Sequence, residues 1–498
     1  MLFNSLQFLV FFPVITALYF ALSPRLRGAL LLGASCYFYM SFRPIYIFVL
    51  AFTILVDYFA GIWIDRQEGR SRKLCLMASI FANIGVLGFF KYYNFLTVSL
   101  QGVGGRIGWT YPLNPLDIIL PIGLSFHTFQ SLSYTIEVYR KRQKPETNIG
   151  IFALYVMFYP QLVAGPIERP QNLLHQFHEV HHFEYARVIS GLQLMAWGMF
   201  KKVVVADRLA PFVNQVYDHP RSYTGISFLL ATVFFAFQIY CDFSGYSDIA
   251  LGSAQVMGFG LMENFRTPYF SASVGDFWRR WHISLSTWFR DYVYFPLGGS
   301  RVPFLRRYGN LLITFLVSGL WHGANWTYVI WGGLNGLYLM MEQWGAMLSK
   351  ALFPHWNTPP GLRFPLQAVR TLITFTLICF AWIFFRARTT ADAFYIASHL
   401  TEGLAELPAN LHSLSFIKAN ILMRLAKDEF TLAVMAIPIL LVVELAQHWV
   451  RLRSGVRLRS FVQRQPVYVR WSLYYACCAT LLFFGAFNKA KEFIYFQF

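Results

Sequence analysis

Charged residues are scarce in this chain of 498 residues. Lys, Arg, Asp and Glu together make up 13% of the sequence, about half the share found in a typical soluble domain. By contrast, 56% of the residues belong to the set AVILMFWYC, and aromatic residues alone reach 19%. A soluble protein this apolar lacks the polar side chains to cover its surface, and disordered chains contain far fewer apolar residues. The composition therefore excludes both classes and predicts a membrane protein that crosses the bilayer several times.

Acidic residues are the scarcer of the two charged types. The chain has 24 Asp and Glu against 42 Lys and Arg, which gives a formal net charge of +18. In a soluble protein this excess would suggest nucleic-acid binding. Here the basic residues flank apolar runs, a pattern typical of the anionic, cytoplasmic side of a membrane. We therefore expect the lipid bilayer, and no nucleic acid, as their partner.

The sequence also lacks features of secreted and metal-binding proteins. Its six cysteines form no C-x-x-C pair, so we interpret them as small core residues and expect neither disulfides nor a metal site. The N-terminus, MLFNS, has no basic segment before the first apolar run and no small-residue cleavage site. This predicts a first span that is retained.

Apolar runs long enough to approach the thickness of a bilayer recur along the chain. Their approximate limits are 6–23, 28–42, 45–62, 75–92, 114–137, 149–165, 188–206, 224–245, 310–329, 330–349, 368–386, 430–449 and 470–488. Several runs are short or contain Pro, Gly or an ionisable residue, as Asp57 and Glu444 illustrate. The sequence therefore predicts an all-α fold of about 11–13 transmembrane or re-entrant helices with further interfacial helices.

Basic clusters predict the orientation of the spans. Arg25 and Arg27 follow the first run, and two further clusters occupy residues 66–73 and 140–144. Each pair of these clusters is separated by an even number of predicted crossings, so all three share one side. Because basic residues gather on the cytoplasmic side, we expect the N-terminus outside the cytoplasm. The six arginines of residues 451–470 are expected to be cytoplasmic too.

The segment VGDFWRRWHISLSTWFRDY, residues 274–292, combines Trp and Arg at helical spacing. In one continuous helix its apolar and charged residues would lie on opposite sides. The apolar side would hold Trp278, Trp281, Leu285, Trp288 and Tyr292, and the charged side Asp276, Arg279, Arg280, Thr287, Arg290 and Asp291. This pattern predicts a helix in the membrane interface, with His282 at the boundary between the two sides. A simple membrane anchor fits the same periodicity.

His322 lies in the middle of a long apolar run. An ionisable group is costly in such surroundings and therefore suggests function. Gly319 and Gly323 flank the histidine at GxxxG spacing, and Gly332 and Gly336 repeat this spacing. The glycines either let helices pack closely or leave room for a slender ligand beside the imidazole.

Residues 178–182 spell H-E-x-x-H, the pattern of zinc proteases. On a helix His178 and His182 would share a face, as zinc binding requires. The segment lies in a polar connection and offers no evident third carboxylate ligand, so we interpret it as a solvated, histidine-rich loop.

Two long blocks resemble the signature blocks of the membrane-bound O-acyltransferase (MBOAT) family. They are FWRRWHISLSTWFRDYVYFPLGGSR (277–301) and GLWHGANWTYVIWGGLNG (319–336). Further similar stretches are LPIGLSFHTFQSLSYTIEVYR (120–140), QLVAGPIERP (161–170), QIYCDFSGYSDIA (238–250) and MGFGLMENFRTPY (257–269). The similarity covers about residues 1–390 and points to the bacterial branch that acts in O-acetylation of alginate and other polysaccharides.

The resemblance implies transfer of an acyl group from a thioester to a hydroxyl. The invariant histidine of the family matches His322, and its second polar position matches His282. A histidine suits this chemistry because its ordinary pKa near 6.5 allows it to accept the hydroxyl proton and return it to the leaving thiolate. His282 would orient the acceptor or polarise the thioester carbonyl.

Substrate-binding residues are expected around the two histidines. Arg279 and Arg280 would meet the phosphates of the donor, although interfacial arginines also contact lipid. The other expected binding residues are Trp281, Trp321, Asn325, Asp242, Ser244 and Tyr246. The last three would line the acyl passage or bond to a catalytic histidine, and they equally fit a polar helix end with capping residues.

The resemblance also implies partners, location and domain limits. Acetyl-CoA would be the donor substrate, with no cofactor, and a periplasmic acetyltransferase would complete the modification from a bacterial inner membrane. Residues 1–390 would form the catalytic membrane core, 391–429 a polar connection and 430–498 the C-terminal transmembrane helices. Alginate, cellulose, another exopolysaccharide and peptidoglycan all remain possible acceptors, and the formation of an acyl-enzyme stays open.

Two functions of other classes fit a polytopic membrane protein. A transporter that relays protons through histidines would predict internal repeats and paired carboxylates along several spans, and neither is evident in the sequence. A subunit that anchors a polysaccharide-secretion complex would need no chemistry of its own. Acyl transfer that depends on His322 distinguishes an enzyme from both.

Overall fold

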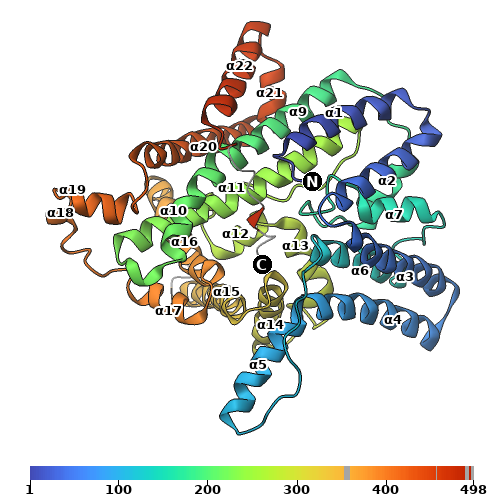
Figure 1. Ribbon diagram of the computed structural model, residues 1–498, viewed down its shortest axis with the longest axis horizontal. Coiled ribbons are helices and arrows are strands. Elements are labelled where there is room, and N and C mark those ends of the chain that lie inside the picture. The colour runs from blue at the N-terminus through green and yellow to red at the C-terminus, as the bar shows by residue number, and fades with distance from the viewer. Residues whose placement is uncertain (353–358, 456, 488–492, 495–498) are drawn as a thin grey trace. The chain divides into compact units, whose positions relative to one another are not determined.

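The computed structural model of this chain describes residues 1–352, 359–455, 457–487 and 493–494. Every regular element in these residues is a helix, and none of them forms a strand (Figure 1). Seven helical stretches of this described part are long and apolar enough to cross a membrane. They are Pro44–Arg66, Gly69–Arg106, Tyr185–Tyr217, Ile226–Met257, Gly361–Arg386, Lys427–Arg451 and Val467–Phe484. The prediction of an all-α, polytopic membrane protein is confirmed.

Some predicted runs are shorter as helices than as apolar sequence. The run 149–165 is helical only over α7 (Ile149–Met157). Pro160 follows closely, and its ring disfavours helical backbone at Tyr159. The chain then continues as a buried turn up to Gly165. Apolar character alone therefore overestimates the length of this helix, and the total number of crossings stays a prediction.

The chain divides into two compact units, which we describe separately. Unit 1 comprises residues 1–197 and 246–263, and unit 2 comprises residues 198–245 and 264–494. The helix α11 (Ile226–Met257) contributes its first part to unit 2 and its second part to unit 1. The predicted domain limits at residues 390 and 429 remain predictions.

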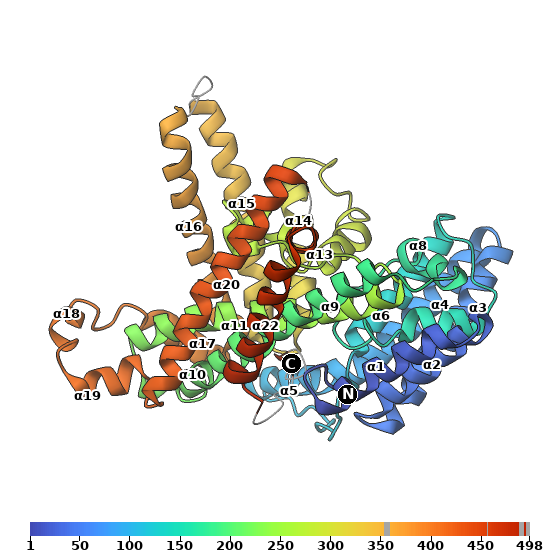
Figure 2. The same cartoon turned by 90° about the horizontal axis from the view of Figure 1, so that it is seen from above.

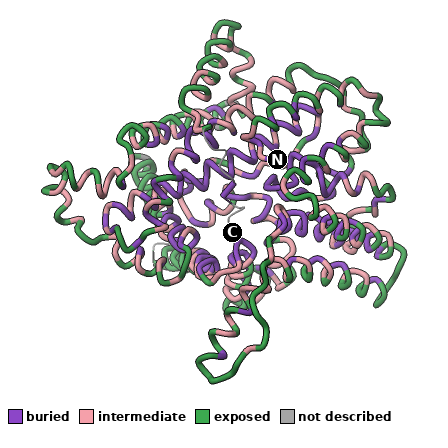
Figure 3. The backbone as a smooth tube through the Cα atoms, viewed as in Figure 1, coloured by how far each residue is buried: buried purple, intermediate pink, exposed green. Residues whose placement is uncertain are grey.

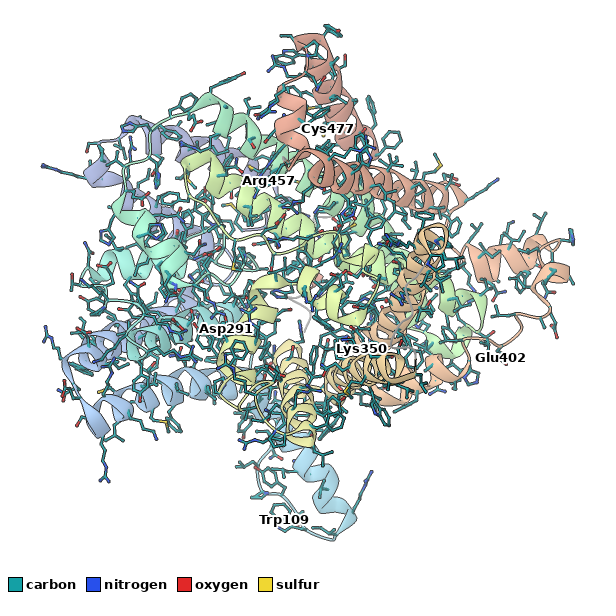
Figure 4. The ribbon with its side chains drawn as sticks, turned by 180° about the vertical axis from the view of Figure 1, so that it is seen from behind. Trp109, Asp291, Lys350, Glu402, Arg457 and Cys477 are labelled. Atoms are coloured by element: carbon teal, nitrogen blue, oxygen red, sulfur yellow. The ribbon has the colours of Figure 1, made fainter. Side chains whose placement is uncertain are left out.

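Unit 1 is built from the N-terminal helices. Besides α7 and parts of α9 and α11 they are α1 (Leu6–Ala21), α2 (Pro24–Met40), η1 (Pro44–Tyr46), α3 (Ile47–Arg66), α4 (Gly69–Leu87), η2 (Gly88–Tyr92), α5 (Tyr93–Arg106), α6 (Leu124–Tyr139), α8 (Pro170–Leu173) and η3 (Leu174–His178). The helix α9 covers Tyr185–Met199. The helix α5 and the loop after it project from this unit, with Trp109 near the tip (Figure 4).

Polar side chains join three helices inside unit 1. The Oδ1 atom of buried Asp57, on α3, accepts hydrogen bonds from Ser79 at 2.6 Å and from Asn83 at 2.9 Å, both on α4. The Ser79 hydroxyl also lies 3.2 Å from the hydroxyl of Thr135 on α6. These bonds supply the polar partners that a carboxylate requires in apolar surroundings.

Two of the predicted basic clusters meet at one end of unit 1. Arg72 of α4 donates from Nη2 to the carbonyls of Val138 at 3.0 Å and Tyr139 at 2.8 Å, in the last turn of α6. Arg72 belongs to the cluster at residues 66–73, and α6 leads directly into the cluster at 140–144. The structure thus brings these two clusters to the same end of unit 1, as the orientation argument expects.

Unit 2 holds the remaining helices. They are η4 (Phe200–Ala206), α10 (Asp207–Tyr217), η5 (Pro220–Ser222), η6 (Pro268–Phe270), α12 (Val274–Arg280), α13 (Ile283–Phe289), η7 (Arg290–Tyr294), α14 (Phe304–His322), α15 (Trp326–Leu352), α16 (Pro360–Arg386), α17 (Thr390–Ser398), α18 (Leu407–Asn410), α19 (Leu414–Phe416), η8 (Ile417–Ile421), α20 (Lys427–Ser454), α21 (Leu458–Gln463) and α22 (Val467–Phe484). Figure 2 shows α15 and α16 running side by side.

Burial within unit 2 is concentrated on a few elements. The part of α11 that belongs to this unit is mostly buried, as are α12 and α13 on the sides that carry their aromatic residues (Figure 3). By contrast, α22 has no buried residue. The two histidines predicted to be catalytic lie in the buried part of this unit.

Candidate active site

The segment 274–292 is not one helix. It forms α12 and α13, separated by Trp281 and His282, and then continues as the π-helix η7. His282 adopts the left-handed conformation, with φ of +44°, which costs a non-glycine residue on the order of 1–3 kcal/mol and which occurs often at functional sites. The prediction of a single interfacial helix is therefore wrong.

Backbone pairing with a distant segment explains the break. The backbone N–H of Arg266 donates to the carbonyl of Arg280 at 2.9 Å, and that of Ile283 donates to the carbonyl of Asn264 at 2.9 Å. These two bonds on either side of the turn replace bonds that a continuous helix would have made. The periodicity of 274–292 carries no information about this partner, because residues 264–266 lie outside it.

The tryptophans of this segment face the protein interior. Trp281 and Trp288 are only 1% and 6% exposed. The ring of Trp281 stacks on Phe277 at 5.4 Å between centroids and lies 5.1 Å from Trp382. The sequence correctly predicted an apolar and a charged side, but Trp281, Leu285 and Trp288 of the apolar side are buried in the protein.

His282 is held by a network of polar groups. Its Nδ1 atom lies 3.2 Å from the Oδ1 atom of Asn264. The same oxygen accepts hydrogen bonds from the backbone N–H of Ser284 at 3.2 Å and from its hydroxyl at 3.0 Å. All three residues are buried, and burial lowers the pKa of His282 to about 3. The ring is therefore neutral at physiological pH.

His322 is the last residue of α14 and is surrounded by aromatic rings. The centroid of its ring lies 4.9 Å from Trp331, 5.0 Å from Trp321 and 5.4 Å from that of Phe385. The ring of His282 lies 6.4 Å away. The structure thus brings the two predicted catalytic histidines together, with Trp321 beside both, since it lies 6.1 Å from His282.

The glycines near His322 are packing surfaces. A Cβ atom on Gly332 would lie 2.3 Å from the carbonyl oxygen of Phe315, and one on Gly319 would lie 2.2 Å from the carbonyl oxygen of Tyr328. At Gly323 an added Cβ would meet the ring of Tyr328 at 2.0 Å. Protein atoms fill the space beside these three glycines, so the hypothesis that they leave room for a ligand is wrong, and close helix packing explains them.

The predicted donor-binding arginines differ in their surroundings. Arg280 forms an ion pair with Asp276 at 2.9 Å, one turn earlier on α12. Arg279 is exposed. Further along, Arg290 pairs with Asp291 at 2.8 Å, and Figure 4 labels this aspartate. The charged side of the segment thus lies outward, as predicted, and of the two proposed donor contacts Arg279 is the more accessible.

Asn325 caps a helix. Its Oδ1 atom accepts a hydrogen bond from the backbone N–H of Thr327 at 3.1 Å, at the start of α15. Its Nδ2 atom donates to the carbonyl of Arg388 at 3.1 Å. These bonds give Asn325 a structural function beside His322, and its predicted contact with substrate stays a prediction.

Asp242 belongs to a buried ion cluster in unit 2. Its Oδ1 atom accepts from Lys202 of η4 at 2.6 Å, and Lys202 also bonds to Asp207 at 3.0 Å. The Oδ2 atom of Asp242 accepts from the backbone N–H of Ile494 at 2.7 Å. Both oxygens are thus engaged by groups other than histidine.

The two other polar residues predicted on this stretch of α11 have separate surroundings. Ser244 is buried in unit 2, whereas Tyr246 belongs to unit 1, where its ring stacks on Phe3 at 4.4 Å between centroids. The prediction that these residues line an acyl passage remains a prediction.

The H-E-x-x-H segment does not have the geometry of a zinc-protease site. The helix η3 ends at His178, and Glu179 has extended backbone. His178 and His182 therefore share no helix face. The Nε2 atom of His178 lies 2.8 Å from a carboxylate oxygen of Glu146 instead.

Sequence reasoning missed several residues of the site. Asn264 lies within a stretch that was noted for its resemblance, but no spacing links it to His282. Trp331 and Phe385, which contact His322, occur in long apolar helices. In the sequence each of them is an aromatic residue within an apolar run. Many other residues of this chain fit that description, so nothing marked these two as part of the site.

Comparisons with known proteins match the part of the chain that holds this site to a protein family. Residues 123–385 match the model of MBOAT, the membrane-bound O-acyltransferase family. The matched region contains both histidines and every element described around them up to Phe385.

Curated relatives extend the similarity beyond this region. The probable alginate O-acetylase AlgI of Pseudomonas aeruginosa is 41% identical over 391 residues, which cover 78% of this chain and 72% of that protein. The peptidoglycan O-acetyltransferase of Helicobacter pylori is 34% identical over 426 residues, covering 79% and 78%. The teichoic acid D-alanyltransferase of Bacillus subtilis is 25% identical over 287 residues, covering 55% and 70%.

Proposed function

This chain belongs to the membrane-bound O-acyltransferase family, and from this premise we propose that it transfers acetyl groups from cytosolic acetyl-CoA for O-acetylation of an extracytoplasmic polysaccharide, with alginate as the first acceptor to test. Membership makes it an O-acyltransferase with several membrane-spanning helices, as the sequence predicted. The donor, the acceptor and the location are the parts that we propose.

The names of the relatives support the choice of reaction and acceptor. Two of them are named for O-acetylation, of alginate and of peptidoglycan, and a more distant one for D-alanylation of teichoic acid. All three names describe addition of a small acyl group to a polymer. Identity is higher to the alginate protein than to the peptidoglycan protein, which favours alginate. Peptidoglycan and cellulose remain the alternative acceptors.

The pair of histidines is the observation that supports acyl transfer most directly. His322 would take the proton from the acceptor hydroxyl as its oxygen attacks the thioester carbonyl carbon, and would return it to the thiolate when the carbon–sulfur bond breaks. His282, 6.4 Å away between ring centroids, would orient a reactant. The reaction releases no net proton, so one base that acts twice is sufficient.

The positions of basic residues support the proposed donor, orientation and location. Exposed Arg279 would meet donor phosphates. The meeting of two basic clusters at one end of unit 1 supports a cytoplasmic side there, an N-terminus outside and insertion in a bacterial inner membrane. A periplasmic acetyltransferase would be the partner that completes the modification.

Purified protein in lipid nanodiscs, supplied with radiolabelled acetyl-CoA, tests the reaction. We expect release of free CoA and labelling of mannuronan oligosaccharides in the presence of a periplasmic acetyltransferase. His322→Ala should lower the rate about 10²- to 10⁴-fold, as for loss of an acid–base group. His175→Ala is the matched control, because this side chain is 59% exposed and lies in unit 1.

Two outcomes contradict the proposal. A rate for His322→Ala close to that of the wild type would remove His322 from the chemistry. Absence of any CoA release by the wild-type protein would favour a transporter or a scaffold. Parallel reactions with cellulose and peptidoglycan fragments identify the acceptor by their relative rates.

A further inference from the structure

The orientation of the buried Asn264 side chain is fixed by a donor that cannot change. The backbone N–H of Ser284 can only donate a hydrogen bond, and it points at one end of the Asn264 amide at 3.2 Å. That end must therefore be the oxygen and not the NH₂ group. The Ser284 hydroxyl, at 3.0 Å, donates to the same oxygen.

This oxygen in turn determines where His282 carries its proton. An amide oxygen accepts hydrogen bonds and never donates them. Because the Nδ1 atom of His282 lies 3.2 Å from the Asn264 oxygen, the favourable arrangement places the proton on Nδ1. In a neutral imidazole the other nitrogen, Nε2, then carries the lone pair. Burial, which lowers the pKa of His282 to about 3, keeps the ring neutral.

Backbone hydrogen bonding keeps Asn264 next to His282. The N–H of Ile283 donates to the carbonyl of Asn264 at 2.9 Å, directly beside the side-chain contact. The left-handed turn at His282 places its ring beside this segment. A strained residue held in place by a distant segment of the chain is typical of a preorganised site.

We propose that Asn264 is a positioning residue that holds His282 in the Nδ1-protonated form, so that Nε2 accepts a hydrogen bond from an O–H group of the acceptor. This inference rests on the proposed acyl transfer and makes it more specific. A histidine in this form cannot donate from Nε2 to the thioester carbonyl. Of the two roles that the resemblance leaves open for His282, only orientation of the acceptor remains.

The acceptor O–H in question is not the one that reacts, because His322 takes that proton. Sugar rings commonly carry a second hydroxyl next to the first, and such a neighbouring O–H supplies the donor that Nε2 needs. His282 itself undergoes no change in protonation in this step.

Among the residues that the structure describes, few charged or titratable groups face the His282 ring. From α14 it faces His322, and from α11 the uncharged ring of Phe243 at 4.5 Å. Asp242, next to Phe243, is engaged by Lys202 and Ile494. The 264–266 segment contributes the neutral amide of Asn264, and α13 the hydroxyl of Ser284. A carboxylate introduced at position 264 would thus be a new charge in direct contact with the ring.

Nitrogen-15 NMR of histidine-labelled full-length protein in nanodiscs tests the tautomer without any enzymatic assay. The His282 signals are assigned by their absence in His282→Asn. We expect the wild type to be protonated on Nδ1, and Asn264→Leu to lose this preference. A wild-type ring protonated on Nε2 would overturn the inference, whether or not acetyl transfer is observed.

Kinetics with acetyl-CoA and mannuronan oligosaccharides test the consequence. Asn264→Leu should lower kcat about 10- to 100-fold, the value of one buried hydrogen bond, with the KM for acetyl-CoA within about twofold of wild type. Asn264→Asp keeps an acceptor for Nδ1–H, so it should recover most of kcat at alkaline pH. Its negative charge stabilises the imidazolium and raises the pKa of His282, so its rate should begin to fall at a higher pH than that of the wild type.

A buried asparagine elsewhere in unit 2 provides the matched control. Asn310 is 4% exposed and donates to the carbonyls of Leu297 and Gly299. Asn310→Leu should lower thermal stability without moving the pH profile or the His282 tautomer. A wild-type pH profile in folded Asn264→Asp, or an unchanged kcat in Asn264→Leu, would overturn the inference. Failure of the wild type to release CoA would instead count against the proposed function.

Discussion

The two histidines of the site are positioned by opposite means. His322 ends α14, a continuous helix whose close crossing with α15, at Gly319 and Gly332, sets the place of the imidazole against Trp331. His282 lies in a break between two short helices, where a segment some eighteen residues earlier supplies its hydrogen bonds. Helix packing fixes the first ring and a polar network the second. Rigid placement within a membrane protein can therefore be achieved through close backbone contact or through hydrogen bonds, and the two are sensitive to different substitutions.

Substitution of each histidine by asparagine should give the largest contrast. We expect His322→Asn to lower acetyl transfer about 10²- to 10⁴-fold, because an amide cannot accept and return a proton. His282→Asn should lose less activity, since an amide oxygen still accepts a hydrogen bond and asparagine tolerates the left-handed backbone. Initial rates of CoA release by the two purified variants decide the ranking. The reverse ranking would mean that His282 is the base.

The glycines of α15 should distinguish close packing from open space. Gly332→Ala must push α14 and α15 apart, because its Cβ would lie 2.3 Å from a backbone oxygen, so we expect a loss of about 1–3 kcal/mol in the free energy of unfolding. Gly333→Ala is the matched control, since its Cβ would lie 3.7 Å from Leu316 and alanine is the better helix former. Thermal unfolding in detergent compares them. Equal stability of the two variants would argue against the close crossing.

Acidification should lower the stability that the polar network around His282 contributes. It should leave the close contact between α14 and α15 at the glycines unchanged. The pKa of His282 is about 3 in the folded protein and about 6.5 in the unfolded chain. Between these values the unfolded chain binds more protons, so the free energy of unfolding rises with pH by up to about 1.4 kcal/mol per unit. The contribution of the neutral ring is complete above pH 6.5 and is lost as the pH falls toward 3. The difference between wild type and His282→Asn should therefore depend on pH only in this window, and a constant difference would contradict the assignment.

Substitution of an arginine on the outward side of α12 should change the kinetics of acetyl transfer the least. Arg279→Gln should raise the KM for acetyl-CoA a few-fold without changing kcat, which corresponds to about 1 kcal/mol for an exposed charge. The effect should shrink at high salt. Arg280→Gln should alter KM less, because Arg280 is already paired with Asp276. A larger effect for Arg280 would place the donor phosphates on the other side of this helix.

The comparison also shows what could be predicted from the sequence. Local sequence patterns predict the helical fold, the apolar runs and the charged side of residues 274–292. The family resemblance predicts that His282 lies near His322. Each of these features is encoded within a few turns of one helix or within one long motif. The all-α membrane fold could be predicted for the same reason.

The errors share a different origin. The break at His282 depends on backbone bonds from residues 264–266, and the burial of Trp281 depends on Trp382, about a hundred residues later. Helical periodicity describes one side of a contact and cannot reveal its partner. The glycine spacing near His322 was compatible with a packed or an open surface, and the positions of Phe315 and Tyr328 decided between them.

The buried carboxylate of Asp57 has a consequence for biogenesis. A helix that enters the bilayer with an unpaired aspartate at its centre is penalised by about 2.5–3.5 kcal/mol on insertion scales. The partners of Asp57, Ser79 and Asn83, lie on the very next helix, so α3 and α4 can satisfy the carboxylate as soon as both have left the ribosome. We therefore expect α3 and α4 to insert as a hairpin, with Thr135 of α6 joining Ser79 only after some fifty further residues have been synthesised.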